Sequence, residues 1–502
     1  MLKLIFVSLA VMIGSTLFSE DVYRKTHHPQ AKSEFDFLLE NIWKKQNITP
    51  AQEASDAVFV RRAYLDFLGR TPSVEEAKSY VASEEKDKHE LLIENLLADH
   101  DFALYWSMRF GDALRIKSEF PINLWPNAAY AYTRIVYEFL GKNQPYDQFV
   151  RSLLLSEGSN FRQPEVNFYR AMAVRSPEGI ANAVSSFFMG KSLVELPSDI
   201  QKTLPQFFEC VKYKSTKEWK EEIVFAERLE NTRSFSLPNG KMVVVKKNGD
   251  PREALCHYLI VQENPYFASA LVQRVWRWFF GVELDAGDTT LRFLAADFKR
   301  SGYNLKSLCK LIGNSSAYRA SSFYDGDLEK ATKFHAVYPI RRLDAEVLDD
   351  TIRLITQTPA RYSSVILEPF SFIPPDARTV ALADGSIDNS FLLLFGRPSR
   401  DTGLPSERSN EISIKQRLFL YNSADLFRRV SRISGPKRRP RESVENYYWH
   451  FYSRPPTAEE YKFLVATFNN QTEKKWLFYG NLQQFRMNMK FCYLQIYHQK
   501  FG

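Results

Sequence analysis

Cysteine and histidine are scarce in this chain, whose 502 residues include four cysteines and eight histidines. No C-x-x-C-H motif occurs, which excludes covalent attachment of a c-type haem. The pairing of Cys210, Cys256, Cys309 and Cys492 stays open. Four cysteines allow three disulfide arrangements, and a chain of this length can also keep them as buried free thiols.

The sequence also lacks the common catalytic signatures. It contains no phosphate-binding glycine loop, no G-x-S-x-G nucleophile elbow and no H-E-x-x-H motif. Its histidines are scattered, and an isolated one such as His257 or His335 is typical of a structural role. The Asp-Gly-Asp stretch at 325–327 lacks the later ligands of a calcium loop. We therefore predict no metal site and no cofactor, and motifs assign no reaction.

Long hydrophobic runs are absent beyond the N-terminus. Lys3, the uncharged run from Leu4 to Gly14 and the small residues after it predict a signal peptide over residues 1–19. We therefore expect an exported protein, periplasmic or secreted. The run is shorter than the roughly 20 apolar residues of a membrane span, so we expect no transmembrane segment in the mature chain. An uncleaved N-terminal anchor is the alternative.

Composition and length indicate a globular protein of two domains. Apolar residues make up 44% of the chain and charged residues 25%. The net charge of +8 is spread along the chain and favours acidic partners only weakly. We expect an N-terminal helical domain over residues 20–232, a β-hairpin linker over 233–249 and a C-terminal helical domain over 250–502.

The stretch NPYFASALVQRVWRWFFG, from Asn264 to Gly281, predicts the central helix of a core. Asn264 can cap the helix, Pro265 suits its first position, and Gly281 suits a left-handed residue at its end. The stretch is too apolar to lie bare. Because helical patterns recur along the chain, the predicted fold class is mainly α, with two helical domains and a small β-hairpin near their junction.

The segments between these patterns are less regular. A charged run over 218–230 is interpreted as helical, and Asn239-Gly240 between apolar flanks predicts a tight hairpin turn. Residues 357–411 are rich in proline and poor in periodicity, which is usual for a functional loop. Residues 454–460 repeat the capping box of residues 70–76. We interpret this repeat as two independent helix starts, with a duplicated unit as the alternative.

Two basic clusters are candidate binding sites. The first comprises Arg397, Arg400, Glu407, Arg408 and Glu411. Arginine binds a carboxylate or sulfate through paired hydrogen bonds, so an anionic ligand is one interpretation. The alternative is that Arg397 and Arg408 form internal ion pairs with Glu407 or Glu411.

The second cluster is a candidate polyanion patch. Its members are Arg428, Arg429, Arg432, Lys437, Arg438, Arg439 and Arg441. It predicts either a solvated turn around Gly435-Pro436 or contact with a sulfated glycan or lipid head group. We expect no nucleic-acid partner, because nucleic acid is a poor candidate for an exported protein.

Five stretches together resemble a known family. They are FVRRAYLDFLGRTPSVEEAKSYV, NPYFASALVQRVWRWFFG, SGYNLKSLCKLIGNSSAYRASS, RRLDAEVLDD and FGRPSRDTGLPSERSNE. With them the chain is similar to exported planctomycete and verrucomicrobial proteins that pair a PSCyt-type domain with a PSD-type domain, both of unknown function. The resemblance implies export and a largely helical fold, and it implies no established reaction.

This sequence departs from that family where a cofactor is concerned. Many members carry C-x-x-C-H after a Phe-aliphatic-Gly stretch, and the corresponding positions here are Glu195, Ser198 and Asp199. Where many members carry cysteines before the Glu-Arg of the FGRP segment, this chain has Leu404 and Ser406. The chain therefore resembles a divergent member without the haem motif.

The leading functional hypothesis is a non-redox, extracytoplasmic binding or assembly protein, because a helical framework stands without a catalytic signature. Its partner would be an anionic glycan or another exported protein. The alternative is an enzyme acting on an anionic or sulfated polysaccharide, with residues 395–411 lining its site. A second alternative is an electron-transfer partner.

Overall fold

The structure is a computed structural model that describes residues 22–218, 220–260, 264–285, 287–359, 361–371, 373–374, 376–431 and 440–462. The predicted signal peptide and Cys492 lie outside these residues, as do Arg432, Lys437, Arg438 and Arg439 of the polyanion patch. Within the described ranges, no helix has both the length and the apolar character needed to cross a membrane.

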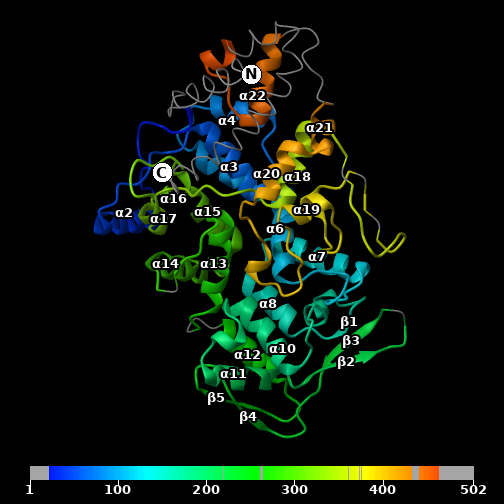
Figure 1. Ribbon diagram of the computed structural model, residues 1–502. Coiled ribbons are helices and arrows are strands. Elements are labelled where there is room, and N and C mark those ends of the chain that lie inside the picture. The colour runs from blue at the N-terminus through cyan, green and yellow to red at the C-terminus, as the bar shows by residue number, and fades with distance from the viewer. Residues whose placement is uncertain are drawn as a thin grey trace.

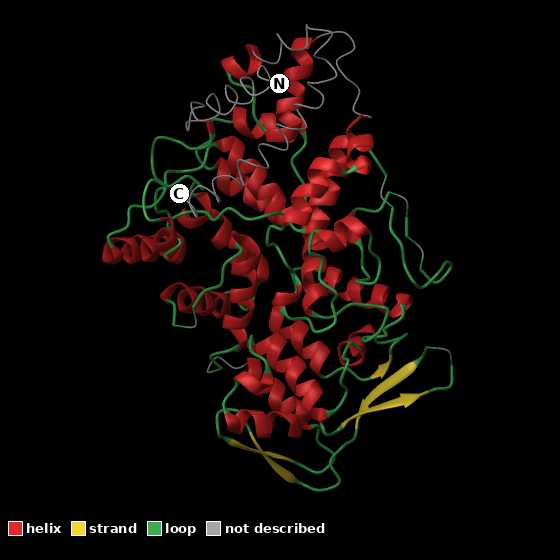
Figure 2. Cartoon of the chain, in the orientation of Figure 1, coloured by secondary structure: helices red, strands yellow, loops and turns green. Residues whose placement is uncertain are grey.

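Helices dominate the described chain, so the predicted mainly α fold class is confirmed (Figures 1 and 2). Those before the strand-rich part are α2 (Glu34–Gln46), α3 (Asp56–Leu68), α4 (Val74–Ala82), α5 (Lys88–Ala98), α6 (His100–Ala113), α7 (Pro126–Gly141), α8 (Tyr146–Leu154), α9 (Asn167–Arg170), α10 (Pro177–Val184) and α11 (Ser198–Thr203). Those after it are α12 (Pro251–Ile260), α13 (Phe267–Phe280), α14 (Thr289–Arg300), α15 (Leu305–Asn314), α16 (Ser316–Arg319), α17 (Leu328–Lys333), α18 (Ala345–Thr356), α19 (Ser390–Leu394), α20 (Ile414–Asn422), α21 (Ala424–Ser431) and α22 (Pro440–Tyr452).

Two small antiparallel sheets lie at one end of the molecule, near α10 to α12 (Figure 1). One is the predicted hairpin, in which β4 (Arg233–Ser236) pairs with β5 (Met242–Val245). Its turn contains Gly240 at a φ of 78°, a backbone conformation that glycine adopts without strain. The structure therefore confirms the hairpin that Asn239-Gly240 predicted.

The other sheet has the strand order β1-β3-β2, formed by β1 (Gly158–Ser159), β3 (Glu222–Ala226) and β2 (Val211–Ser215). The predicted helix over 218–230 is therefore wrong. Ile223, Val224 and Phe225 are β-branched or aromatic and pair with the preceding strand, and Val224 is fully buried. Pairing and burial outweigh the helical preference of the charged residues around them.

Helix α13 lies in the core, as predicted. The Asn264 side chain accepts hydrogen bonds from the backbone N–H groups of Tyr266 (2.8 Å) and Phe267 (3.3 Å). The N-cap residue is Tyr266, so the predicted cap position was two residues too early. The first helical residue is Phe267 rather than Pro265. Gly281 ends the helix in the left-handed conformation. The buried face of α13 packs mainly against α14 and against the helical turn Ser185–Met189.

One continuous hydrophobic core joins the two halves of the chain. It extends from Phe35 in α2 to Val380, and the rings of Phe67 in α3 and Phe279 in α13 lie 5.0 Å apart between centroids. A smaller cluster around Leu348 and Phe395 joins α18 to α19 and α20. Because the main core includes residues from both predicted domains, the division at 232–250 stays a prediction.

Two segments far apart in the sequence adopt the same local structure. Arg70 donates to both carboxylate oxygens of Glu76 (2.8 and 2.9 Å), and Arg454 donates to both oxygens of Glu460 (2.7 and 2.8 Å). A left-handed residue precedes each arginine, and each glutamate closes a capping bond with the residue three positions earlier. Helix α22 also packs against α4. A capping box gives this local geometry wherever it occurs, so the interpretation as two independent helix starts, with a duplicated unit as the alternative, stays a prediction.

Candidate functional site

The first predicted site lies where the segment after α19 meets α6 and α18. Arg408 donates to both oxygens of Glu346 (2.7 and 2.9 Å) and forms two hydrogen bonds to Asp112 (3.0 and 2.7 Å). Arg400 binds the other oxygen of Asp112 at 2.9 Å, and Arg397 lies 3.4 Å from Glu346. The structure therefore brings three of the five predicted residues together, on carboxylates that come from α6 and α18.

Asp344, just before α18, completes this group, which we call the arginine cluster. Burial alone would raise the pKa of Asp344, but Arg109 and Arg408 outweigh burial and hold that pKa well below its ordinary value. Arg408 lowers the pKa of fully buried Glu346 in the same way. The arginine cluster thus holds four arginines and three carboxylates: Arg109, Arg397, Arg400, Arg408, Asp112, Asp344 and Glu346.

The acidic partners differ from the predicted ones. Glu407 accepts hydrogen bonds from the backbone N–H groups of Asp401 (3.1 Å) and Thr402 (2.8 Å), so its carboxylate fixes its own loop. Glu411 is exposed. The prediction that either residue pairs with Arg397 or Arg408 was wrong, because the true partners are far away in the sequence. Internal partners favour the structural interpretation of these arginines.

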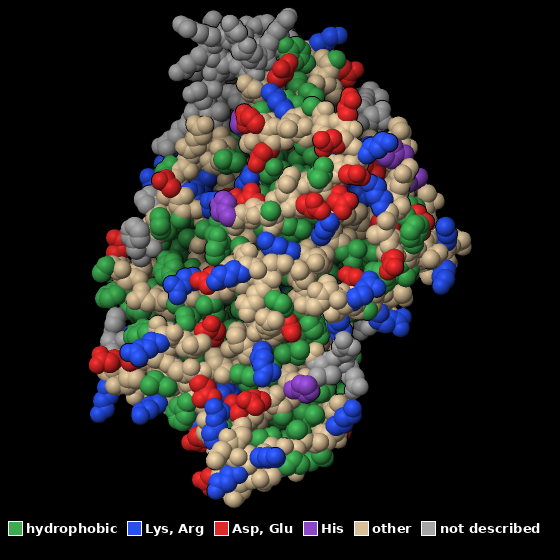
Figure 3. All heavy atoms as spheres, turned by 180° about the vertical axis from the view of Figure 1, so that it is seen from behind, with side chains coloured by type: hydrophobic (Ala, Val, Ile, Leu, Met, Phe, Trp, Pro, Cys, Tyr) green, Lys and Arg blue, Asp and Glu red, His purple; other side chains and the backbone are tan. Residues whose placement is uncertain are grey.

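The described part of the polyanion patch is also paired. Arg429 lies 2.7 Å from Asp425 and 3.4 Å from Asp349 of α18, and Arg428 lies 3.8 Å from Asp425. Arg441 belongs to α22. The face opposite to Figure 1 shows basic and acidic side chains interspersed over the surface (Figure 3). Contact of this patch with a polyanion stays a prediction.

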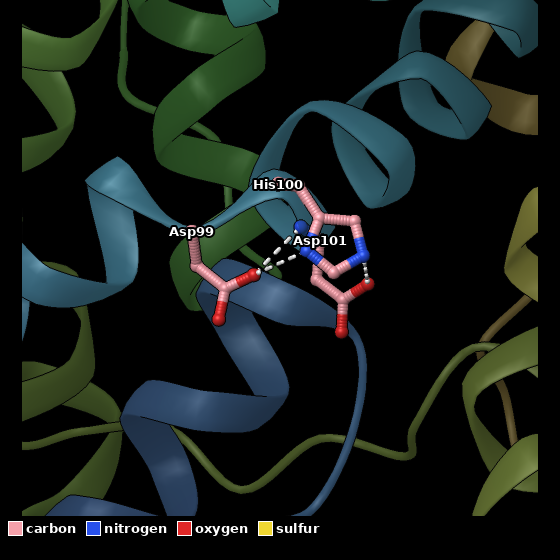
Figure 4. Close-up of side chains that lie close together, drawn as sticks. All are labelled: Asp99, His100 and Asp101. Atoms are coloured by element: carbon pink, nitrogen blue, oxygen red, sulfur yellow. Dashed lines mark hydrogen bonds and ion pairs between the residues drawn. The ribbon is translucent and has the colours of Figure 1, made fainter.

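Among the residues that the structure describes, one group of neighbouring side chains has the spacing of metal ligands. Asp99, His100 and Asp101, at the start of α6, place one ligand atom each within 4.8 Å of one another (Figure 4). However, Asp99 caps α6, and Asp101 already pairs with Arg70 (3.1 Å) and Arg378 (2.8 Å). These arginines supply the positive charge that a cation would bring, so the group is better explained as a helix start.

A cavity lies between the N-terminal segment, α2, α5 and α15. Its volume is about 620 Å³, and we call it the N-terminal cleft. A second cavity, of about 690 Å³, borders it, because Lys25 and His27 line both. Two of the helices around the cleft begin at side-chain caps: Ser33 caps α2 and Asn304 caps α15. These caps fix where the walls of the cleft begin.

A network of paired charges lines the cleft and the bordering cavity. Lys25 lies 3.0 Å from Glu53 and 2.9 Å from Asp56. Lys88 lies 2.7 Å from Asp56, and Arg319 lies 3.5 Å from Glu53. We call these five residues the floor network. Three cations face two carboxylates, so the network carries one surplus positive charge.

His89 stands beside this network. Its Nε2 lies 3.5 Å from an oxygen of Glu53 and has no hydrogen-bond partner among the described residues. Its ring packs on Phe59 at 4.3 Å between centroids. Burial, with the charge of Lys25 as the next cause, lowers the pKa of His89 to about 4. The imidazole is therefore neutral at pH 7.

Sequence reasoning missed the floor network because its members come from separate segments. Lys25 precedes α2, Glu53 and Asp56 lie around the start of α3, Lys88 opens α5, and Arg319 ends α16. No spacing pattern links these positions. The only local signal was a charged residue beside a histidine at 88–89, and such pairs are common on exposed helices.

The three described cysteines are free and buried: Cys210, Cys256 and Cys309. Burial raises the pKa of both Cys210 and Cys256 to about 11. These three thiols therefore stay protonated at neutral pH and are poor nucleophiles.

Comparison with known families identifies both halves of the chain. Residues 34–195 match PSCyt2, described as "Protein of unknown function (DUF1549)", and residues 251–468 match PSD1, described as "Protein of unknown function (DUF1553)". The chain therefore belongs to the two-domain proteins that pair a PSCyt-type with a PSD-type domain, in that order. No curated protein and no solved structure matches it.

Proposed function

We propose that this protein is a non-redox binding protein that acts outside the cytoplasm and holds a polar ligand in the N-terminal cleft. The observation that carries the proposal is an open cavity of about 620 Å³ with a network of ion pairs as its floor. Cavities of about 300–1,000 Å³ are usual for ligands of small to medium size. The predicted signal peptide supports action outside the cytoplasm, and the absence of a C-x-x-C-H motif supports a non-redox role.

The floor network is costly to the fold, and this cost supports a role in binding. Glu53 and Arg319 are each only 5% exposed. Taking such charges out of water costs several kcal/mol per ion, and apolar residues of similar volume are often equally stabilising. A buried charged network beneath an open cavity is therefore better explained by a ligand than by stability alone. In contrast, the arginine cluster is covered by its own chain.

The test is a screen of wild-type protein against a panel of neutral, carboxylated and sulfated oligosaccharides, read by calorimetry. Ser307 lines the cleft from α15, and Ser307→Trp should fill part of it without removing an ion pair. Ser152→Trp, at an exposed position of α8, is the matched control. We expect Ser307→Trp to weaken binding at least about tenfold. Equal affinities of the two variants would contradict a ligand in the cleft.

The second candidate is an enzyme acting on an anionic or sulfated polysaccharide. His89 favours it, because a neutral imidazole beside a carboxylate in a cleft can act as a general base. Reducing ends or free sulfate should then accumulate when a polysaccharide is incubated with the protein. His89→Asn should stop their release, while calorimetry should still detect binding of the polysaccharide. Binding without any release favours the binding protein.

A further inference from the structure

We propose that the ligand of the N-terminal cleft is an oligosaccharide with a single carboxylate or sulfate group, and that this group lies over the floor network. The inference rests on the proposed function and adds the chemical class of the ligand. Its basis is the distribution of charge between the floor and the rim of the cleft, together with the polar character of the walls.

The floor favours one negative charge. Within the floor network, the cations Lys25, Lys88 and Arg319 exceed the carboxylates Glu53 and Asp56 by one. The other charged residues that line the cleft are three cations and three carboxylates, which balance one another: Lys32, Lys86, Lys310, Asp36, Glu85 and Glu90. One positive charge is therefore uncompensated. Charges interact more strongly where water is partly excluded. A single carboxylate or sulfate over the floor would complete the balance.

The rim does not favour further negative charges. Lys310 already lies 3.1 Å from Glu90 and 2.6 Å from Glu94. Lys32 lies 3.8 Å from Asp87. The rim therefore presents both signs of charge close together. A ligand with many sulfates would place some of them beside these carboxylates, so the cleft discriminates against a polyanion.

Most of the side chains that line the cleft are polar and can form hydrogen bonds to hydroxyl groups. Gln30, Ser33, Ser307 and Asn314 contribute amides and hydroxyls, and Leu311 is the one apolar residue among the described residues that line the cleft. Peptides that bind as an added strand, as an amphipathic helix or as a proline-rich segment need a strand edge or apolar pockets, which these side chains do not provide. The bordering cavity leaves room for a chain of several sugars. Among acidic ligands, an oligosaccharide fits best.

His89 adds a hydrogen-bonding atom at the right place. Its Nε2 stands beside Glu53 without a hydrogen bond, and the ring is fixed by its contact with Phe59. Depending on the tautomer, a neutral imidazole offers a donor or an acceptor there. It can therefore bind the acidic group or a neighbouring hydroxyl without changing the surplus charge of the floor.

The experiment compares four probes by calorimetry on the full-length protein. They are an aldouronic acid with one carboxylate, the matching neutral xylo-oligosaccharide, a monosulfated carrageenan oligosaccharide and a heavily sulfated heparin fragment. We expect the carboxylated or the monosulfated probe to bind about ten- to hundredfold more tightly than the neutral one, the gain of one charged hydrogen-bonding group. The stronger of these two probes identifies the acidic group.

Variants then test the charge of the floor. Lys25→Gln removes the surplus charge and should abolish the preference for the acidic probe. Lys117→Gln is the matched control, because Lys117 is similarly covered and pairs with Asp401 at 2.6 Å outside the cleft. The double variant Lys25→Gln/Glu53→Gln restores one surplus positive charge and should recover the preference. A preference that survives Lys25→Gln, or that the double variant does not recover, overturns the inference.

The outcomes separate this inference from the proposed function. If neutral and acidic probes bind equally and Ser307→Trp weakens both, the cleft is a binding site but the ligand is not acidic. If the heparin fragment binds most tightly, the ligand is a polyanion and the inference fails. If no probe binds, or if Ser307→Trp has no effect on binding, the proposed function and the inference both fail.

Discussion

Replacing Arg408 or Glu346 tests how the arginine cluster balances its charges. Arg408→Ala removes four hydrogen bonds. Three arginines and three carboxylates then remain, in the pairs Arg109–Asp344, Arg397–Glu346 and Arg400–Asp112. Because no carboxylate is left alone, the loss in the free energy of unfolding should be about 3 kcal/mol, the lower end for a buried pair.

Glu346→Gln should lower the free energy of unfolding by more than Arg408→Ala does, although it is the smaller chemical change. It leaves four arginines with only two carboxylates, and Arg397 loses its one ion pair within 4 Å among the described residues. We expect a loss of about 5 kcal/mol, the upper end for a broken buried pair.

Urea denaturation of both variants measures these losses directly. Glu411→Gln, at an exposed position of the same segment, is the control and should stay within about 0.5 kcal/mol of the wild type. The reasoning is refuted if Arg408→Ala costs as much as Glu346→Gln. It is also refuted if both cost less than about 1 kcal/mol, the value for an exposed pair.

Two further predictions concern single positions. Gly69→Ala should lower the free energy of unfolding by about 2–4 kcal/mol, because φ is 60° and the new Cβ would lie 2.5 Å from the Tyr105 ring. Gly240→Ala, whose new Cβ would lie in open space, should lower it less in the same urea denaturation experiment. The pKa of His89 falls from 6.5 to about 4 on folding, so the unfolded chain binds its proton first and stability is lost as pH falls through this range. His89→Asn should remove up to about 3 kcal/mol of this pH dependence, and a denaturation profile identical to that of the wild type would contradict the shift.

Local signals predicted the helices and the hairpin well. Asn264 accepts the hydrogen bonds of the N–H groups that lead into α13, and Asn239-Gly240 turns the hairpin. Each of these features is decided within a few residues. Strand β3 was missed because its stability comes from pairing with β2 and from the burial of Val224, which the charged residues around it conceal.

The sites depended on contacts that the sequence does not encode locally. The sequence indicated that Arg397 and Arg408 need acidic partners, but it suggested the nearest glutamates. The structure supplies Asp112 and Glu346, from helices far away in the chain. The floor network was invisible for the same reason, because Lys25 and Arg319 meet only at Glu53 after the N-terminal segment has packed beside α16.

The most direct test of the central claim is a crystal structure of the protein with the acidic oligosaccharide that binds most tightly. The proposed function predicts ligand density in the N-terminal cleft, with the carboxylate or sulfate within hydrogen-bonding distance of Lys25, Lys88 or His89. Density at Arg397 and Arg408, or along the basic residues between 428 and 441, would contradict the claim and return the site to the segment that the sequence suggested.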